Sequence, residues 1–259
     1  MTKDELNFYL NQKLSTPVVE GKSKKFYDLG NNIYFMVFKP HLRSITSKRE
    51  ENIDGTDIER LKVTEKFFNL CSRKAIPTQL LYHKIVEIDE MQGLLVEKTR
   101  TIPLEFIVRY YAAGSIVRLF PSIVIEGQQF KQPLLKYDLK QDISVAGVDD
   151  PTMNESYIVG LGLLKENELK TVRSYTLSVA DIINKHLKLN HIKLIDMKME
   201  FGFTMNGEIV LIDEVSQDCI RANDMETDES LTKDAFRNMK TDEEVLEAYK
   251  NFTKRTERG

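Results

Sequence analysis

The feature that most constrains this chain is a pair of acidic segments joined by an Asn-Gly dipeptide. Residues 193–202 (KLIDMKMEFG) alternate apolar and charged side chains, which is typical of a half-buried strand. Asn206-Gly207 is a favoured sequence for a two-residue type I′ turn, and apolar residues then lead to Asp213. If these two residues form the turn, Glu200 lies directly opposite Asp213 in an antiparallel hairpin.

Carboxylates that face each other across a hairpin weaken it unless a cation compensates their charge. Asp196 is expected on the same face as Glu200 and Asp213, two pairs further along. A divalent cation with oxygen ligands, Mg²⁺ in particular, would satisfy all three carboxylates. The pattern therefore predicts a magnesium site. The alternative is a solvated acidic strand face, because charged strand faces are common on surfaces.

Composition excludes several classes of protein. The 259 residues suffice for one large domain or two lobes, and a net charge of −3 gives no bulk attraction to nucleic acid. No run of about 18 apolar residues could span a bilayer, and the polar N-terminus is unlike a signal peptide. Two cysteines make neither a disulfide framework nor a zinc site. A cytoplasmic protein that contacts neither membrane nor nucleic acid is expected.

The pattern of apolar residues predicts an α+β chain in two lobes. A strand-rich lobe is expected at 1–99 and a larger mixed lobe at 100–259. Helices are expected at 4–13, 57–74, 166–187 and 242–252, strands at 33–38, 78–87, 94–98 and 104–110, and loops at 39–55 and 120–157. The last helix should begin with a capping box at Thr241.

Two further constellations suggest anion binding. Gly21-Lys22-Ser23-Lys24 lacks Walker A spacing, but glycine with alternating lysines can close over a polyphosphate; a surface turn is the alternative. Arg109 precedes Ala113-Gly114-Ser115, where exposed N–H groups at a helix start and a hydroxyl would hold a phosphate with the guanidinium. An ordinary helix cap beside a surface arginine is the alternative here.

Five ordered motifs together resemble one family. They are Gly21–Lys24, Ile102–Arg109 with Ala112–Ser115, Asp150–Ser156, Asp196–Gly202, and Asp213–Asp218 with Arg221. In this order the chain resembles the phosphoribosylaminoimidazole-succinocarboxamide synthases, or SAICAR synthetases, of purine biosynthesis. The likeness runs from about Glu20 to Arg237, nearly the whole chain.

The resemblance implies a fold and a reaction. The fold would have two α+β lobes with ATP between them, related to ATP-grasp and kinase-like designs. The enzyme would use ATP and Mg²⁺ to activate the carboxylate of carboxyaminoimidazole ribotide (CAIR), and the amine of L-aspartate would then displace phosphate to form an amide. Such chemistry needs positioning and charge neutralisation more than a covalent nucleophile.

The resemblance also implies roles for individual residues. ATP would contact Lys22, Lys24, Lys98, Glu200 and Asp213, of which Glu200 and Asp213 hold Mg²⁺. The catalytic residues would be Asp196, Lys198 and Asp218. The substrates would be bound by Arg109, Ser115, Asp150, Ser216, Arg221 and Arg237. Assembly into a homo-oligomer is left open.

Departures from the family cluster where the acceptor substrates should lie. Lys39–Thr46 lacks the family's acidic and hydroxyl segment, Gln217 replaces a proline and Asn223 a tryptophan, and the loop at 120–150 differs. The expected function is therefore CAIR–aspartate ligation, with three alternatives. These are a paralogous ligase with another carboxylate or amine, a small-molecule kinase, and a nucleotide-binding regulator, which the retained Lys22, Glu200 and Asp213 argue against.

Overall fold

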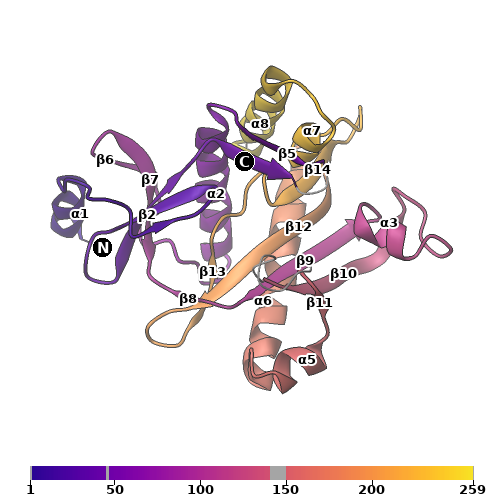
Figure 1. Cartoon of the computed structure of the whole chain (residues 1–259), viewed down its shortest axis with the longest axis horizontal. Coiled ribbons are helices and arrows are strands. Elements are labelled where there is room, and N and C mark those ends of the chain that lie inside the picture. The colour runs from indigo at the N-terminus through magenta and orange to yellow at the C-terminus, as the bar shows by residue number, and fades with distance from the viewer. Residues whose placement is uncertain (1, 45–46, 141–149, 259) are drawn as a thin grey trace.

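The computed structural model describes residues 2–44, 47–140 and 150–258, so part of the divergent segments at 39–46 and 120–150 lies outside the described residues. The first part of the chain forms an antiparallel sheet with strand order β1-β2-β3-β7-β6 (Figure 1). Its strands are β1 (Val19–Glu20), β2 (Lys24–Asp28), β3 (Ile33–Phe38), β6 (Val86–Ile88) and β7 (Met91–Glu97).

A second, larger sheet follows, with strand order β11-β10-β9-β12-β13, and β8 and β14 also pair with β12. Its strands are β8 (Arg100–Thr101), β9 (Leu104–Tyr111), β10 (Gln129–Leu139), β11 (Thr152–Met153), β12 (Ile192–Phe203), β13 (Ile209–Ile212) and β14 (Ile220–Asp224). A separate hairpin consists of β4 (His41–Ser44) and β5 (Arg49–Asn52).

Helices complete the α+β fold. They are α1 (Lys3–Leu10), α2 (Thr56–Ser72), α3 (Ser115–Leu119), α5 (Glu155–Gly160), α6 (Glu166–Leu189), α7 (Lys233–Arg237) and α8 (Asp242–Thr256). The capping box predicted for the last helix is confirmed, since Thr241 Oγ1 accepts from the Glu244 N–H and the Glu244 carboxylate accepts from the Thr241 N–H. Within the described ranges, no helix is long and apolar enough to cross a membrane.

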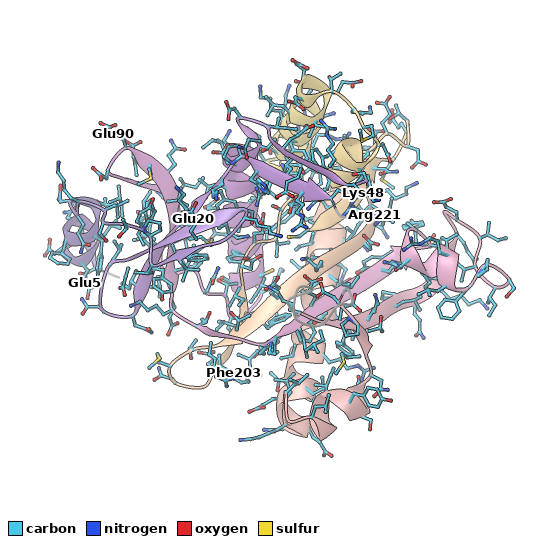
Figure 2. The ribbon with its side chains drawn as sticks, in the orientation of Figure 1. Glu5, Glu20, Lys48, Glu90, Phe203 and Arg221 are labelled. Atoms are coloured by element: carbon cyan, nitrogen blue, oxygen red, sulfur yellow. The ribbon has the colours of Figure 1, made fainter. Side chains whose placement is uncertain are left out.

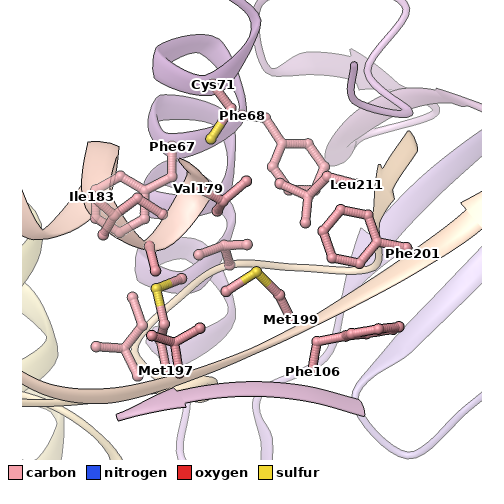
Figure 3. Packing of buried hydrophobic residues seen from close by; sticks show 14 of the residues in the cluster. Phe67, Phe68, Cys71, Phe106, Val179, Ile183, Met197, Met199, Phe201 and Leu211 are labelled. Carbon is pink, nitrogen blue, oxygen red and sulfur yellow. The ribbon is translucent and has the colours of Figure 1, made fainter. Parts of the chain in front are cut away.

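The main hydrophobic core lies between the large sheet and two helices (Figure 3). Phe67 and Phe68 of α2 and Val179 of α6 belong to the same buried cluster as Met199 of β12. Helix α2 thus belongs to the N-terminal half of the sequence but packs with the C-terminal half. The two sheets divide near the predicted boundary at residue 99, whereas the core crosses it, and the division into 1–99 and 100–259 stays a prediction.

A β-bulge in β12 brings the polar residues of this strand to one face. The register of β12 against β14 shifts between Leu194 and Asp196, and the buried core positions change from even numbers before the shift to odd numbers after it. Core positions are Ile192 and Leu194, then Met197, Met199 and Phe201. Lys193, Asp196, Lys198 and Glu200 therefore all lie on the side of the sheet opposite the core.

The predicted hairpin exists, but its predicted register is wrong by one residue. Glu200 pairs with Ile212, and Phe203 pairs with Ile209. The Thr204 N–H donates to Glu208 O at 2.9 Å, so the connection has three residues, with Gly207 in the left-handed region at φ 81°. Asp213 consequently lies just beyond the paired residues, where its own φ is 65°.

Three other expectations were wrong. The predicted loop at 39–55 contains the β4–β5 hairpin, and the predicted connection at 120–157 contains the long strand β10. Residues 78–87 do not form a continuous strand: Thr78 and Leu80 make isolated bridges, and only Val86–Ile88 is a strand. The remaining predicted helices and strands are found within a few residues of their expected ends.

Candidate functional site

Two carboxylates, the buried Glu200 and the partly exposed Asp213, lie at the end of the β12–β13 hairpin. Glu200 is 6% exposed, and its pKa is raised, first by burial and then by the charge of Asp213. Each carboxylate forms an ion pair with a lysine. Lys140 Nζ lies 2.6 Å from Glu200 Oε2, and Lys24 Nζ lies 2.9 Å from Asp213 Oδ1. Although the register differs from the prediction, the two acidic groups are close enough to interact.

The pair fits a magnesium ion that shares its coordination with a nucleotide. Mg²⁺ is usually held by one or two carboxylates together with phosphate oxygens and waters. In the described part of the chain, no three His, Cys, Asp or Glu side chains form a group that could hold a metal by themselves. The predicted three-carboxylate group is therefore wrong, because Asp196 is instead bonded to Arg109 at 3.0 Å. Magnesium binding by Glu200 and Asp213 stays a prediction.

A fully buried charge cluster lies directly behind this pair. Glu214 accepts from Arg60 Nη2 at 2.6 Å and from Arg60 Nε at 3.1 Å, from Lys24 Nζ at 2.6 Å, and from the Ser216 hydroxyl. Burial alone would raise the pKa of Glu214, but Arg60 and Lys24 hold it well below its ordinary value. Burial would likewise lower the pKa of Lys24, yet Asp213 and Glu214 raise it. Lys24, Arg60 and Glu214 are therefore charged at neutral pH.

Two residues that were predicted to contact the ligands, Lys24 and Ser216, are bonded to protein carboxylates in this cluster. Lys24 is 5% exposed and Ser216 is fully buried, so both hold the Asp213-Glu214 segment in place from the protein side. Arg60 was missed by the sequence analysis, because a single arginine beside Leu61 on the buried face of α2 forms no motif. Its role is visible only once α2 is packed against the loop after β13.

A cavity of about 310 Å³ lies between the two sheets, beside the carboxylate pair. Its walls come from the first sheet and from β8, β12 and β13, and they include Val19, Phe26, Tyr34, Gln79, Val96, Glu97, Thr99, Thr101, Lys140, Glu200, Ile212 and Asp213. Lys22 lies exposed on the turn between β1 and β2. Lys98 lies between two lining residues, but its ammonium contacts Asp28 at 2.7 Å and the Tyr34 ring centroid at 4.9 Å.

A second cavity, of about 890 Å³, lies at the other end of the same sheet face. Four of the predicted substrate-binding residues line it, namely Arg109, Ser115, Arg221 and Arg237. Figure 2 shows Arg221 near one end of the large sheet and Phe203 near the other. Gly114 is needed here: its φ is 66°, and a Cβ at this position would lie 2.9 Å from Arg221 Nη1.

Acidic residues orient the arginines of this cavity. Arg109 Nε lies 3.0 Å from Asp196 Oδ2, and Arg221 Nε lies 3.1 Å from Asp234 Oδ2. Arg237 Nη1 donates to Asp234 Oδ1 at 2.6 Å. Because Asp196 and Asp234 occupy only part of each planar fork, the other N–H groups can receive an anion.

The predicted catalytic residues lie between the two cavities or beside them. Lys198 Nζ contacts Glu105 Oε1 at 2.6 Å, and although burial opposes its charge, Glu105 and other acidic neighbours raise its pKa. Asp218 pairs with Lys233 at 2.8 Å. Asp150 lies just before β11 and lines neither of the two cavities. Its predicted contact with the substrate stays a prediction.

The loop that carries Asp218 is attached to the C-terminal helix by Gln217. Its Nε2 donates to Tyr249 O at 3.1 Å and to Thr253 Oγ1 at 3.0 Å, both in α8. Two residues after Gln217, burial and the nearby Glu214 raise the pKa of the Cys219 thiol, which disfavours the thiolate that a nucleophile needs. The loop therefore presents a carboxylate on a fixed backbone.

Comparisons with known proteins agree with this geometry. The family described as SAICAR synthetase matches residues 17–256. A phosphoribosylaminoimidazole-succinocarboxamide synthase of Methanopyrus kandleri is 33% identical over 93% of this chain and 94% of its own length. One from Methanoculleus marisnigri is 35% identical over 91% of this chain and 92% of its own.

Solved structures of proteins with the same name are also similar to this chain. The phosphoribosylaminoimidazole-succinocarboxamide synthase of Ehrlichia chaffeensis has a TM-score of 0.83 at 26% identity, covering 93% of this chain and 98% of that one. A SAICAR synthetase in complex with ADP has a TM-score of 0.82 at 31% identity, covering 92% and 96%. This chain belongs to the SAICAR synthetase family.

Proposed function

We propose that this protein is an ATP-dependent ligase that joins L-aspartate to CAIR, giving SAICAR, ADP and phosphate in purine biosynthesis. The observation that carries the proposal is the single sheet face that links the two cavities. Glu200 marks the nucleotide end, Arg109 and Arg221 mark the phosphate end, and Lys198 lies between them. Relatives over nearly the whole chain carry the name of this activity.

The residues divide the work by position. Phosphoryl transfer from ATP to the CAIR carboxylate gives an acyl phosphate; the aspartate nitrogen then attacks the carbonyl carbon, the C–O bond to phosphate breaks, and the nitrogen loses a proton. Lys198, charged at neutral pH, stabilises the negative oxygens that develop midway along the face. Arg109, Ser115, Arg221 and Arg237 anchor the ribotide phosphate and fix the position of the carboxylate.

Glu200 and Asp213 would hold Mg²⁺ together with the nucleotide phosphates. When bound, the ion supplies positive charge that neutralises these phosphates. The walls of the smaller cavity, which include Phe26, Tyr34 and Val96, suit an adenine ring, since they present apolar surface opposite the carboxylate pair.

The amine is the part of the reaction most open to change. Where the family carries acidic and hydroxyl groups, this chain has the β4–β5 hairpin, in which Arg43 and His41 are bonded to Glu50. A competition among L-aspartate, other amino acids and ammonia, with CAIR and ATP fixed, tests the amine by the mass of the product. We expect SAICAR to be the main product; a different amide would establish the paralogous ligase.

The same assay distinguishes a kinase from a ligase. A ligase releases phosphate only when an amine is present, whereas a kinase accumulates a stable phosphorylated acceptor without one. Formation of ADP with CAIR alone and isolation of such a product would contradict the proposed ligation.

We expect Arg109→Ala to raise the KM for CAIR far more than the KM for ATP. Loss of one charge-assisted bidentate contact costs roughly 2–4 kcal/mol, or about 30- to 1,000-fold. Steady-state kinetics with each substrate varied in turn measures the effect, with the exposed Arg173→Ala on α6 as control. Equal increases for both substrates would make Arg109 a structural residue.

A further inference from the structure

A polar cluster adjoins the arginines of the larger cavity and has no part in the proposed reaction so far. Lys193 of β12 pairs across the sheet with Asn223 of β14, and its ammonium lies 5.6 Å from the centroid of the Tyr111 ring of β9. Lys193, Asn223, Tyr111 and Asp228 all line the cavity that Arg109 lines. The cluster therefore faces the same space as the phosphate-binding residues.

The β12 bulge is the reason Lys193 faces this space. Without the shift, Lys193 and Asp196 would point to opposite faces, because they are three residues apart. With the shift, Lys193 lies on the same face as Asp196, which pairs with Arg109 on the neighbouring strand β9. The strand thus delivers a cation to the phosphate end of the site.

The contacts that hold Lys193 in place are weak. Its ammonium pairs with Asp228, a turn residue whose side chain is 68% exposed and which also accepts from Asn223 Nδ2 at 3.2 Å. An ion pair this exposed is worth about 0–1 kcal/mol, and lysine carries its charge on a flexible stem. Turning the ammonium away from Asp228 therefore costs little.

The arginines, in contrast, are engaged more deeply. Arg109 is 9% exposed and bonded to Asp196, and Arg221 and Arg237 share Asp234. These acids partly neutralise the guanidinium groups that face the cavity. A phosphomonoester carries close to two negative charges at neutral pH, so a further cation at this end would strengthen its binding.

We propose that Lys193 is a fourth cationic contact for the phosphate group of the substrate and that Asp228 is its partner when no phosphate is bound. On phosphate binding, the ammonium leaves Asp228 and joins the arginine cluster. Asp228 thereby competes with the substrate and sets its affinity. The identity of the ribotide rests on the proposed function, whereas the phosphate contact does not.

The first test measures binding of ribose 5-phosphate to the whole protein by titration calorimetry. We expect Lys193→Gln to weaken this binding about tenfold, and Lys193→Arg to restore most of it. Asp228→Asn should tighten binding about two- to fivefold, because it frees Lys193 while keeping a residue that tolerates φ 59°. Opposite effects at the two ends of one ion pair are not expected of a pair that only supports the fold.

Kinetics provides the second test. Lys193→Gln should raise the KM for CAIR by a similar factor and leave kcat and the KM for ATP unchanged. Lys185→Gln, which removes a lysine paired with Asp181 on the surface of α6, is the matched control. Weaker binding in both Lys193→Gln and Asp228→Asn, or unchanged binding in Lys193→Gln, would overturn the inference.

The two proposals fail in different ways. If the wild-type protein forms no SAICAR yet binds ribose 5-phosphate in a Lys193-dependent manner, the ligase assignment is wrong and the phosphate contact stands. If the wild type forms SAICAR and Lys193→Gln does so with an unchanged KM for CAIR, the ligase assignment stands and the phosphate contact of Lys193 is wrong. Wild-type protein that does not bind ribose 5-phosphate at all would also overturn the phosphate contact.

Discussion

Glu200→Gln and Asp213→Asn are each expected to reduce ATP turnover by about 10³-fold or more while the protein remains folded. Each substitution removes the charge of one proposed magnesium ligand and keeps the shape of the side chain. Asparagine also tolerates the left-handed backbone of Asp213, at φ 65°. Turnover measured over a range of Mg²⁺ concentrations, with CAIR and aspartate saturating, gives the result.

Although Glu200→Gln should reduce turnover, it should not reduce the stability of the protein. The raised pKa of Glu200 means that the unfolded chain loses this proton more readily than the folded one. In the absence of Mg²⁺, Glu200 therefore lowers the free energy of unfolding as the pH rises above the ordinary carboxyl pKa, and glutamine removes that effect. We expect an unchanged or higher Tm for this variant at neutral pH.

Glu208→Gln, at an exposed position just after the hairpin connection, is the control, since it changes the same charge without touching the pair. Normal Mg²⁺-dependent turnover in Glu200→Gln and Asp213→Asn would rule out the pair as the metal site. Loss of turnover with a marked fall in Tm would instead indicate that the carboxylates support the fold.

Much of this site could be predicted from local patterns. Alternating apolar and charged residues identified the strand that carries Asp196, Lys198 and Glu200, and an Asn-Gly pair identified its turn. The register could not be settled in the same way, because Gly207 suits two-residue and three-residue connections alike. The error moved Asp213 past the paired residues, yet it left the two carboxylates within electrostatic reach of each other.

Features that depend on packing between distant segments were not predictable. Arg60 and Glu214 are 154 positions apart, and neither belongs to a pattern that indicates the other. The β4–β5 hairpin was expected to be a loop, because Leu42 and Ile53 are the only apolar residues among the described residues of 41–53. Ser44 and Arg49 are buried as well, but polar residues give no sign of this in the sequence. The bulge that turns Lys193 towards the site likewise has no signature in the residues around it.

Arg60→Met is expected to lower the free energy of unfolding by about 3–5 kcal/mol. The substitution keeps much of the side-chain volume but leaves Glu214 buried with one cation fewer, and removing one partner of a buried ion pair usually costs this much. Arg60 and Glu214 are 0% and 2% exposed, so water cannot replace the lost hydrogen bonds. Urea-induced unfolding followed by far-UV circular dichroism measures the difference.

The dependence on pH adds a second signature. Because the pKa of Glu214 lies well below its ordinary value in the folded protein, its contribution to stability is present above that ordinary value and is lost as the pH falls towards the folded pKa. Without Arg60 the folded pKa should rise, so unfolding by acid should begin at a higher pH. Arg173→Met, which breaks an exposed contact of 3.6 Å with Glu155, should show neither effect.

The double variant Arg60→Met/Glu214→Gln separates the loss of a favourable contact from the cost of an unpaired charge. If the unpaired carboxylate causes most of the destabilisation, neutralising it should recover a large part of the 3–5 kcal/mol expected for Arg60→Met alone. If the double variant recovers stability but not turnover, the cluster also has a role in the reaction. That role would be to hold Asp213 in position for the nucleotide, because Lys24 forms ion pairs with both Asp213 and Glu214. If Arg60→Met alone has wild-type stability, Lys24 by itself compensates the charge of Glu214. The contact between Arg60 of α2 and the site would then contribute nothing to the free energy of unfolding.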